Sequence, residues 1–133
     1  RRMDDPNAAI AMAAAQAGLG WEDGAATLLH EPDATSDEDP ARVLAKARIE
    51  AHYFRHNAFL AHGQLLRDID RIRHLPGVIV QGRYDIICPP RSAWDLAQAW
   101  PEARLEMVLA GHGATEPAIT DALIRATDAF ADR

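Results

Sequence analysis

Ahead of Pro76 the apolar residues recur with the spacing of amphipathic helices, whereas after it they form short runs typical of buried strands. One stripe in the first half predicts a helix that begins at Asp39-Pro40, with Asp as the cap and Pro at the first helical position, and ends near His56. The stripe consists of Val43, Leu44, Ala47, Ala51 and Phe54.

The amino-terminal segment carries a similar helix-start signal in Asp5-Pro6. An alanine-rich run over residues 7–17 follows, so a helix is expected there. Gly18 and Gly20 are expected to end it, because glycine is common just after a helix.

Two other segments complete the first half. The polar residues 31–39 have the composition of a loop, and residues 64–73 are expected to form a third helix that ends before Pro76. We therefore expect residues 1–74 to form a helical subdomain and residues 75–133 to form a second, α/β part.

The second half alternates strands with helices. Strands are expected over residues 77–81 and 105–109, and helices over residues 91–100 and 117–131. The last helix carries the stripe Ile119, Leu123, Ala126 and Phe130. Strand, helix, strand and helix in this order predict a parallel βαβ unit with a right-handed crossover.

A parallel sheet of two strands cannot bury both of its faces, so the chain is expected to be the C-terminal part of a larger α/β protein. The chain begins with Arg1 rather than Met, which favours the same interpretation, and the lack of a signal peptide therefore says nothing about compartment. We also expect exposed apolar sheet edges and a tendency to form oligomers.

Composition excludes several classes of protein. The 133 residues carry 14 Lys and Arg against 20 Asp and Glu, a formal charge of −6, which argues against a nucleic-acid partner. No apolar run approaches the ~20 residues that span a membrane. The single cysteine, Cys88, excludes an internal disulfide and a multi-cysteine zinc site.

Two titratable residues follow the two expected strands. Asp85 follows the first and His112 follows the second, so parallel pairing would bring both to one edge of the sheet. An Asp that accepts a hydrogen bond from one imidazole nitrogen leaves the other nitrogen free to act as a general base. The alternative is that Asp85 caps the following turn and that His112 is a surface loop residue.

The nucleophile of such a site is not evident. Neither Ser36 nor Ser92 lies in a G-x-S-x-G elbow, and Ser92 is expected to act at the start of a helix. Cys88 could pair with a histidine, but a buried structural thiol is the commoner case. His52 and His56 have a spacing that could hold a metal ion, but no third ligand is evident, and we expect a solvated helix face.

Six segments carry a more specific combination of motifs: WED at 21–23, ARIEAHYFRH at 47–56, QLLRDIDRIRHLPGVIVQGRYDIICP at 64–89, SAWDLAQAWPEARL at 92–105, GHGATEP at 111–117 and ATDAFA at 126–131. In this order they closely resemble the prolyl aminopeptidases (proline iminopeptidases), which are α/β-hydrolase serine peptidases. The resemblance covers essentially the whole chain but less than half of a typical family member. It implies the C-terminal part of an α/β-hydrolase fold, preceded by helices of a cap subdomain.

The resemblance also implies residue roles. Asp85 and His112 match the acid and base of the catalytic triad, while the serine would lie upstream of this chain. Glu22 and Glu50 match the glutamates that hold the free amino terminus of the substrate. Ile87 and Cys88 are expected to line the pocket for the proline ring.

Peptides with N-terminal proline would then be the substrates, the missing N-terminal portion of the same protein would be a partner, and neither a metal nor an organic cofactor is implied. We expect a cytoplasmic protein whose isolated C-terminal part hydrolyses nothing. The chain departs from the family at Gly113, where serine is usual, and in a loop between Leu109 and His112 that looks one residue short. Another α/β-hydrolase, such as an esterase or amidase, and a non-catalytic binding or assembly module remain as alternatives.

Overall fold

The structure, a computed structural model, describes residues 2–28 and 39–131. The chain divides into two compact units, one of residues 1–24 and 32–62 and the other of residues 25–31 and 63–133. The expected loop over residues 31–39 lies outside the described residues except for its last position, Asp39. The expected assignment of residues 1–74 to a cap subdomain and of residues 75–133 to a hydrolase core stays a prediction.

The first unit is helical, with a short 3-10 turn, η1 (Arg2–Asp4), ahead of helix α1 (Ala8–Ala26). The start signal of α1 differs from the prediction, because the cap is Asn7 rather than Asp5. The Asn7 side chain accepts a hydrogen bond from the Ala9 N–H at 3.0 Å, and Asp5 accepts one from the Asn7 N–H at 2.8 Å. A tight turn at Asp5 thus precedes the helix, which begins at Ala8 rather than at Pro6.

Helix α1 also continues through Gly18 and Gly20, so the expected helix end at these residues is wrong. A glycine inside a helix costs only about 1 kcal/mol relative to alanine, which favourable packing of neighbouring residues offsets. Leu19 supplies such packing, since it is 8% exposed and belongs to a small core with Ala15 and Ala47. Gly18 adds a close approach, because a β-carbon there would lie 3.3 Å from the terminal methyl of Met3.

Helix α2 (Pro40–Arg55) confirms its predicted start and end. The Asp39 side chain caps it by accepting a hydrogen bond from the Ala41 N–H at 3.0 Å, and His56 follows its last residue. The predicted stripe holds only in part, because Ala47 is buried whereas Phe54 is 78% exposed. A 3-10 turn, η2 (Asn57–Phe59), follows α2 and contains non-glycine residues with positive φ.

The second unit begins, after its short segment at residues 25–31, with two short helical turns, α3 (Gln64–Arg67) and η3 (Ile69–Arg71). The single helix expected over residues 64–73 is therefore broken at Asp68, the residue between the two turns. Gly63 precedes α3 with a φ of 68°, a conformation that glycine adopts without strain.

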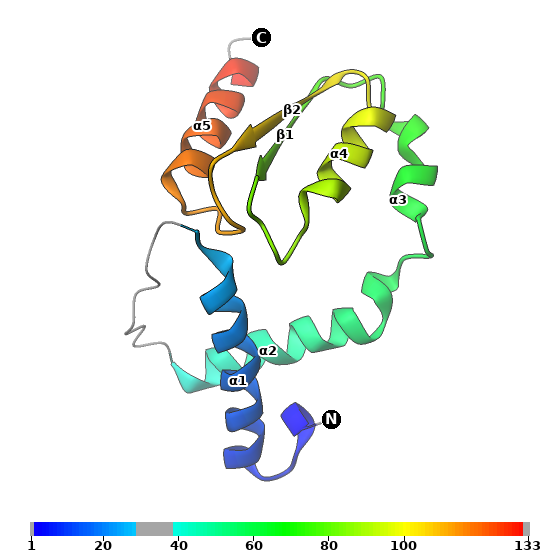
Figure 1. Cartoon of the computed structure of the whole chain (residues 1–133). Helices are drawn as coiled ribbons and strands as arrows, with labels where there is room; N and C mark the ends of the chain where they lie inside the picture. The colour runs from blue at the N-terminus through cyan, green and yellow to red at the C-terminus, as the bar shows by residue number, and fades with distance from the viewer. Residues whose placement is uncertain (1, 29–38, 132–133) are drawn as a thin grey trace. The chain divides into compact units, whose positions relative to one another are not determined.

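The predicted strand–helix–strand–helix order is confirmed in the remainder of this unit. Strand β1 (Gly77–Gly82), helix α4 (Pro90–Ala99), strand β2 (Ala103–Val108) and helix α5 (Pro117–Ala131) follow one another. The two strands pair in parallel with a register from Gly77 opposite Ala103 to Gly82 opposite Val108. Figure 1 shows α4 and α5 on opposite sides of this small sheet.

Apolar side chains remain exposed around the sheet. Leu123 of α5 is 41% exposed, Phe130 is 39% exposed, and Leu109 just beyond β2 is 58% exposed. The predicted stripe of α5 is buried at Ile119 and Ala126, with Ala122 also buried.

Among the helices within the described residues, none combines the length and the apolar character that a membrane-spanning segment requires.

Candidate active site at the carboxyl edge of the sheet

Asp85 and His112 lie together where the two strands of the second unit end. The strand pairing continues past the regular sheet, since the Arg83 N–H donates to the Val108 carbonyl at 2.8 Å and the Tyr84 N–H donates to the Ala110 carbonyl at 3.0 Å. This extension holds the turn after β1 beside the loop after β2. The predicted meeting of Asp85 and His112 at one edge of a parallel sheet is confirmed, with Asp85 Oδ2 at 3.0 Å from His112 Nδ1.

The Asp85 carboxylate, only 6% exposed, accepts hydrogen bonds at both oxygens. Oδ1 accepts from the Ile87 N–H at 3.0 Å and from the Cys88 N–H at 2.7 Å. Oδ2 accepts from Gln81 Nε2 at 3.2 Å in addition to His112 Nδ1. An ionised carboxylate can only accept, so His112 Nδ1 carries a proton and Nε2 is left as the basic nitrogen.

Two opposing effects act on the pKa of Asp85. Burial alone would raise the pKa, but the hydrogen bonds from the Cys88 N–H, His112 and Gln81, with the charge of a protonated His112, lower it below its ordinary value. Asp85 is therefore an anion at neutral pH. This anion fixes which nitrogen of His112 is protonated and would stabilise a positive charge on the ring.

The loop that carries His112 is held closely by backbone contacts. The N–H groups of His112 and Gly113 both donate to the Ala26 carbonyl, each at 2.7 Å. A β-carbon on Gly82, at the end of β1, would lie 1.8 Å from the Gly111 carbonyl oxygen, so only glycine fits this crossing. The loop expected to be one residue short nevertheless presents the His112 ring to Asp85, with 34% of the His112 side chain exposed.

Two polar residues of this site were missed by the sequence analysis. Gln81 lies on β1 four residues before Asp85 and donates to its carboxylate, and Glu116 lies four residues after His112 and is 2% exposed. Residue type gave no signal, because Gln and Glu are usually surface residues, but both positions lie close in sequence to the two predicted site residues and inside the segments that carry the family resemblance.

Ile87 and Cys88, which were expected to line the pocket for the proline ring, donate their backbone N–H groups to the Asp85 carboxylate. Ile87 is half-buried, but Cys88 is exposed, so the expectation of a buried thiol is wrong. Both N–H groups of this turn bind the Asp85 carboxylate, and the Cys88 side chain is accessible. The cap on this turn that the alternative interpretation gave to Asp85 is also present, and it coexists with the bond to His112.

Neither serine of the chain forms part of the pair within the described residues. Ser36 lies outside them, and Ser92 lies in the first turn of α4, as expected, with its N–H donating to the Pro89 carbonyl at 3.0 Å. The described residues contain no group of three or more His, Cys, Asp or Glu side chains that could hold a metal ion. His52 and His56 instead pack their exposed rings near Phe59, with centroids 5.5 and 5.2 Å from its ring.

In the first unit, Glu22 of α1 and Glu50 of α2 lie close enough to interact electrostatically. Burial raises the pKa of Glu50, the negative charge of Glu22 raises it further, and Lys46 partly opposes the rise. The Lys46 ammonium lies 3.9 Å from Glu50 Oε1. The two glutamates that the resemblance pairs are thus near each other, and Glu22 lies on the part of α1 that continues past Gly18 and Gly20.

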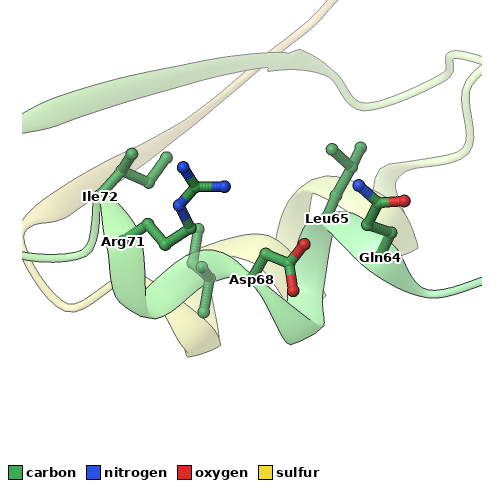
Figure 2. A pocket seen from close by; sticks show the side chains of 6 residues that line it. Gln64, Leu65, Asp68, Arg71 and Ile72 are labelled. Atoms are coloured by element: carbon green, nitrogen blue, oxygen red, sulfur yellow. The ribbon is translucent and has the colours of Figure 1, made fainter. Parts of the chain in front are cut away.

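A separate surface pocket of about 380 Å³ lies on the α3–η3 segment of the second unit (Figure 2). Its lining consists of Gln64, Leu65, Asp68, Ile69, Arg71 and Ile72. None of these side chains belongs to the Asp85–His112 pair. The pocket is therefore distinct from the Asp85–His112 pair.

A carboxylate–imidazole pair at the carboxyl edge of a parallel sheet, with helices on both sides, is consistent with part of an α/β-hydrolase. In sequence, the chain matches the C-terminal part of proline iminopeptidases, which confirms the resemblance.

The proline iminopeptidase of Xanthomonas citri is 52% identical over 135 residues, which cover 98% of this chain and 43% of that protein. The proline iminopeptidase of Xylella fastidiosa strain Temecula1 is 49% identical, with 98% of this chain and 42% of that protein covered. The proline iminopeptidase of Arabidopsis thaliana is 44% identical and is covered over 34% of its length. The chain thus spans less than half the length of these curated relatives, and no protein-family model matches it.

Proposed function

We propose that the complete protein is a serine-type aminopeptidase that releases N-terminal proline from peptides, and that this chain supplies the acid and base of its triad. The observation that carries this proposal is the 3.0 Å hydrogen bond between His112 Nδ1 and Asp85 Oδ2, in a chain that matches proline iminopeptidases. The nucleophilic serine and the oxyanion donors then belong to the part of the protein outside this chain.

In this mechanism the serine oxygen attacks the carbonyl carbon of the N-terminal proline while His112 Nε2 accepts the hydroxyl proton. The tetrahedral intermediate collapses, the peptide C–N bond breaks, and His112 returns that proton to the leaving amine. Water then attacks the prolyl ester with His112 again as base, and proline and the free serine are released. Asp85 stays ionised throughout and stabilises the imidazolium form of His112.

The pair formed by Glu22 and Glu50 would bind the ammonium group of the substrate. Burial is the largest cause of the raised pKa of Glu50, and the negative charge of Glu22 adds to it, so a cation between the two carboxylates would relieve their mutual repulsion. A buried ammonium is unfavourable without such counter-charges, so this pair would favour a free amino terminus over a blocked one. Ile87 and Cys88 would form an apolar wall for the proline ring.

The complete gene product that contains this chain provides the test, with prolyl-anilide and N-acetyl-prolyl-anilide as substrates. We expect cleavage of the free-amine substrate only. Glu50→Gln should lower kcat/KM for this substrate at least tenfold, whereas Glu102→Gln, a matched change in the turn before β2, should leave it unchanged. Equal cleavage of both substrates would favour a general amidase or esterase, and no cleavage of either would favour a non-catalytic role.

The isolated 133-residue chain is expected to cleave neither substrate, because it carries no serine elbow. Cys88 is the residue that could contradict this, since it is exposed and its backbone N–H binds the Asp85 carboxylate. Turnover by the isolated chain that is abolished by Cys88→Ala would identify Cys88 as the nucleophile and refute the assignment of an external serine.

A further inference from the structure

Glu116 is a buried carboxylate whose two oxygens bind backbone N–H groups from distant parts of the chain. It is 2% exposed. Oε1 accepts from the Gly111 N–H at 2.7 Å, and Oε2 accepts from the Leu28 N–H at 3.2 Å. Burying a carboxylate is costly unless its oxygens are hydrogen-bonded, so this side chain is committed to holding these two groups.

A second pair of hydrogen bonds joins the same two segments of the second unit. The Ala26 carbonyl accepts from the N–H groups of His112 and Gly113, each at 2.7 Å. Of these four hydrogen bonds, three link residues 26–28 to the segment from His112 to Glu116, and the fourth joins Gly111 to Glu116 within the loop that carries His112. We call this set the loop clasp.

The clasp opposes the flexibility of the loop. His112 stands between Gly111 and Gly113, and glycine has more conformational freedom than any other residue. A β-carbon at Gly111 would lie 2.8 Å from the Ala26 carbonyl oxygen and 3.1 Å from Glu116 Oε1, so the close fit requires glycine there. Gly111 therefore cannot carry a side chain of its own to restrain the loop, and the Glu116 carboxylate restrains the Gly111 backbone instead.

We propose that Glu116 is a positioning residue, which acts through the Gly111 N–H and the loop clasp to hold the His112 ring against Asp85. The inference rests on the proposed function, in which His112 is the base. Glu116 does not touch the reacting atoms. Its effect is on the placement of His112 Nε2, and a misplacement of about 1 Å costs about 100-fold in rate.

Glu116→Gln tests the proposal in the complete protein. The amide retains one accepting oxygen and turns an NH₂ group toward the other N–H, so one half of the clasp becomes a donor–donor contact. We expect kcat for prolyl-anilide to fall about 10- to 100-fold, with KM changed less than about twofold, since the substrate-binding residues are untouched. Glu116→Asp keeps both oxygens and the charge but is shorter, and its kcat should lie between wild type and Glu116→Gln.

Ala126→Gly is the control for general destabilisation, because it weakens α5 at a buried position away from the clasp. Amide hydrogen exchange of residues 111–113 supplies a readout independent of activity. Exchange at these amides should accelerate in Glu116→Gln well beyond the acceleration in Ala126→Gly. The His112 Nδ1 proton resonance should also broaden or disappear in Glu116→Gln and persist in the control.

The proposal is overturned if Glu116→Gln lowers kcat no more than Ala126→Gly, or if exchange at residues 111–113 is unchanged. If Glu116→Gln does not fold, the same measurements on Glu116→Asp decide the question in the same way. An inactive wild-type protein would refute the proposed function. The exchange and Nδ1 resonance measurements would still determine whether Glu116 positions His112.

Discussion

Replacing Asp85 by asparagine removes one negative charge and replaces one of the two accepting oxygens by an NH₂ group, which can only donate hydrogen bonds. The new side-chain amide would keep its oxygen toward the Ile87 and Cys88 N–H groups, which donate at 3.0 and 2.7 Å in the wild type. Its NH₂ group would then face Gln81 Nε2 and His112 Nδ1, where the carboxylate accepts at 3.2 and 3.0 Å.

Gln81 cannot relieve this contact by rotating its amide. Its Nε2 also donates to the Gly82 and Cys88 carbonyls at 3.1 Å each, so rotation would set its own oxygen against two carbonyl oxygens. His112 must therefore adapt. It can accept from the new NH₂ group only by moving its proton from Nδ1 to Nε2, where the reaction needs a base.

The expected loss in kcat is about 10⁴-fold, the size of the effect of the same substitution in the serine-protease triad, and corresponds to about 5 kcal/mol in the activation free energy. The assay is initial-rate hydrolysis of prolyl-anilide by the complete protein. Asp95→Asn is the control, because Asp95 pairs with Arg91 on the exposed side of α4 and should change the rate less than twofold. A loss of less than tenfold in Asp85→Asn would refute the assignment of Asp85 as the group that fixes the His112 tautomer.

Two further predictions concern the carboxylate pair and the strand crossing. As pH falls through the raised pKa of Glu50, protonation removes a charge that would bind the substrate ammonium, so KM for prolyl-anilide should rise. Glu22→Gln removes the like charge and should move that rise to lower pH, and a pH profile of KM that is the same in wild type and variant would contradict this reasoning. Gly82→Ala places a β-carbon 1.8 Å from the Gly111 carbonyl oxygen, so the loop must shift, and kcat should fall about 100-fold. Val80→Ala, a change in the same strand, is the control, and equal rates for the two variants would show that the crossing does not position the loop.

The strands and helices of the second unit from β1 onward could be predicted because local patterns agree with the tertiary structure there. β-Branched residues bounded by turn residues indicated β1, and the helical spacing after Pro117 indicated α5 with matching bounds. In the first unit, tertiary packing overrode a local signal. Leu19 makes a small core with Ala47 of α2, and this burial sustains α1 through the neighbouring glycines.

The Asp85–His112 pair could be predicted because parallel strands end at the same edge of a sheet and bring the following residues together. Glu22 and Glu50 could be paired only by the resemblance, since their proximity depends on how α1 crosses α2. The pair also depends on α1 continuing past Gly20, where the sequence pattern predicted a helix end.

The residues that hold the pair in place escaped prediction for a different reason. Most of the contacts around Asp85 and His112 come from backbone N–H and carbonyl groups, such as those of Cys88 and Ala26, and backbone groups leave no signature in residue type. Where a side chain does contribute, it is a single Gln or Glu that would equally suit a surface. Gly82 and Gly111 matter as much to this network as the polar side chains do, because a β-carbon at either position would collide with a backbone carbonyl oxygen. The positions most sensitive to substitution around this site should therefore include two glycines that touch no substrate.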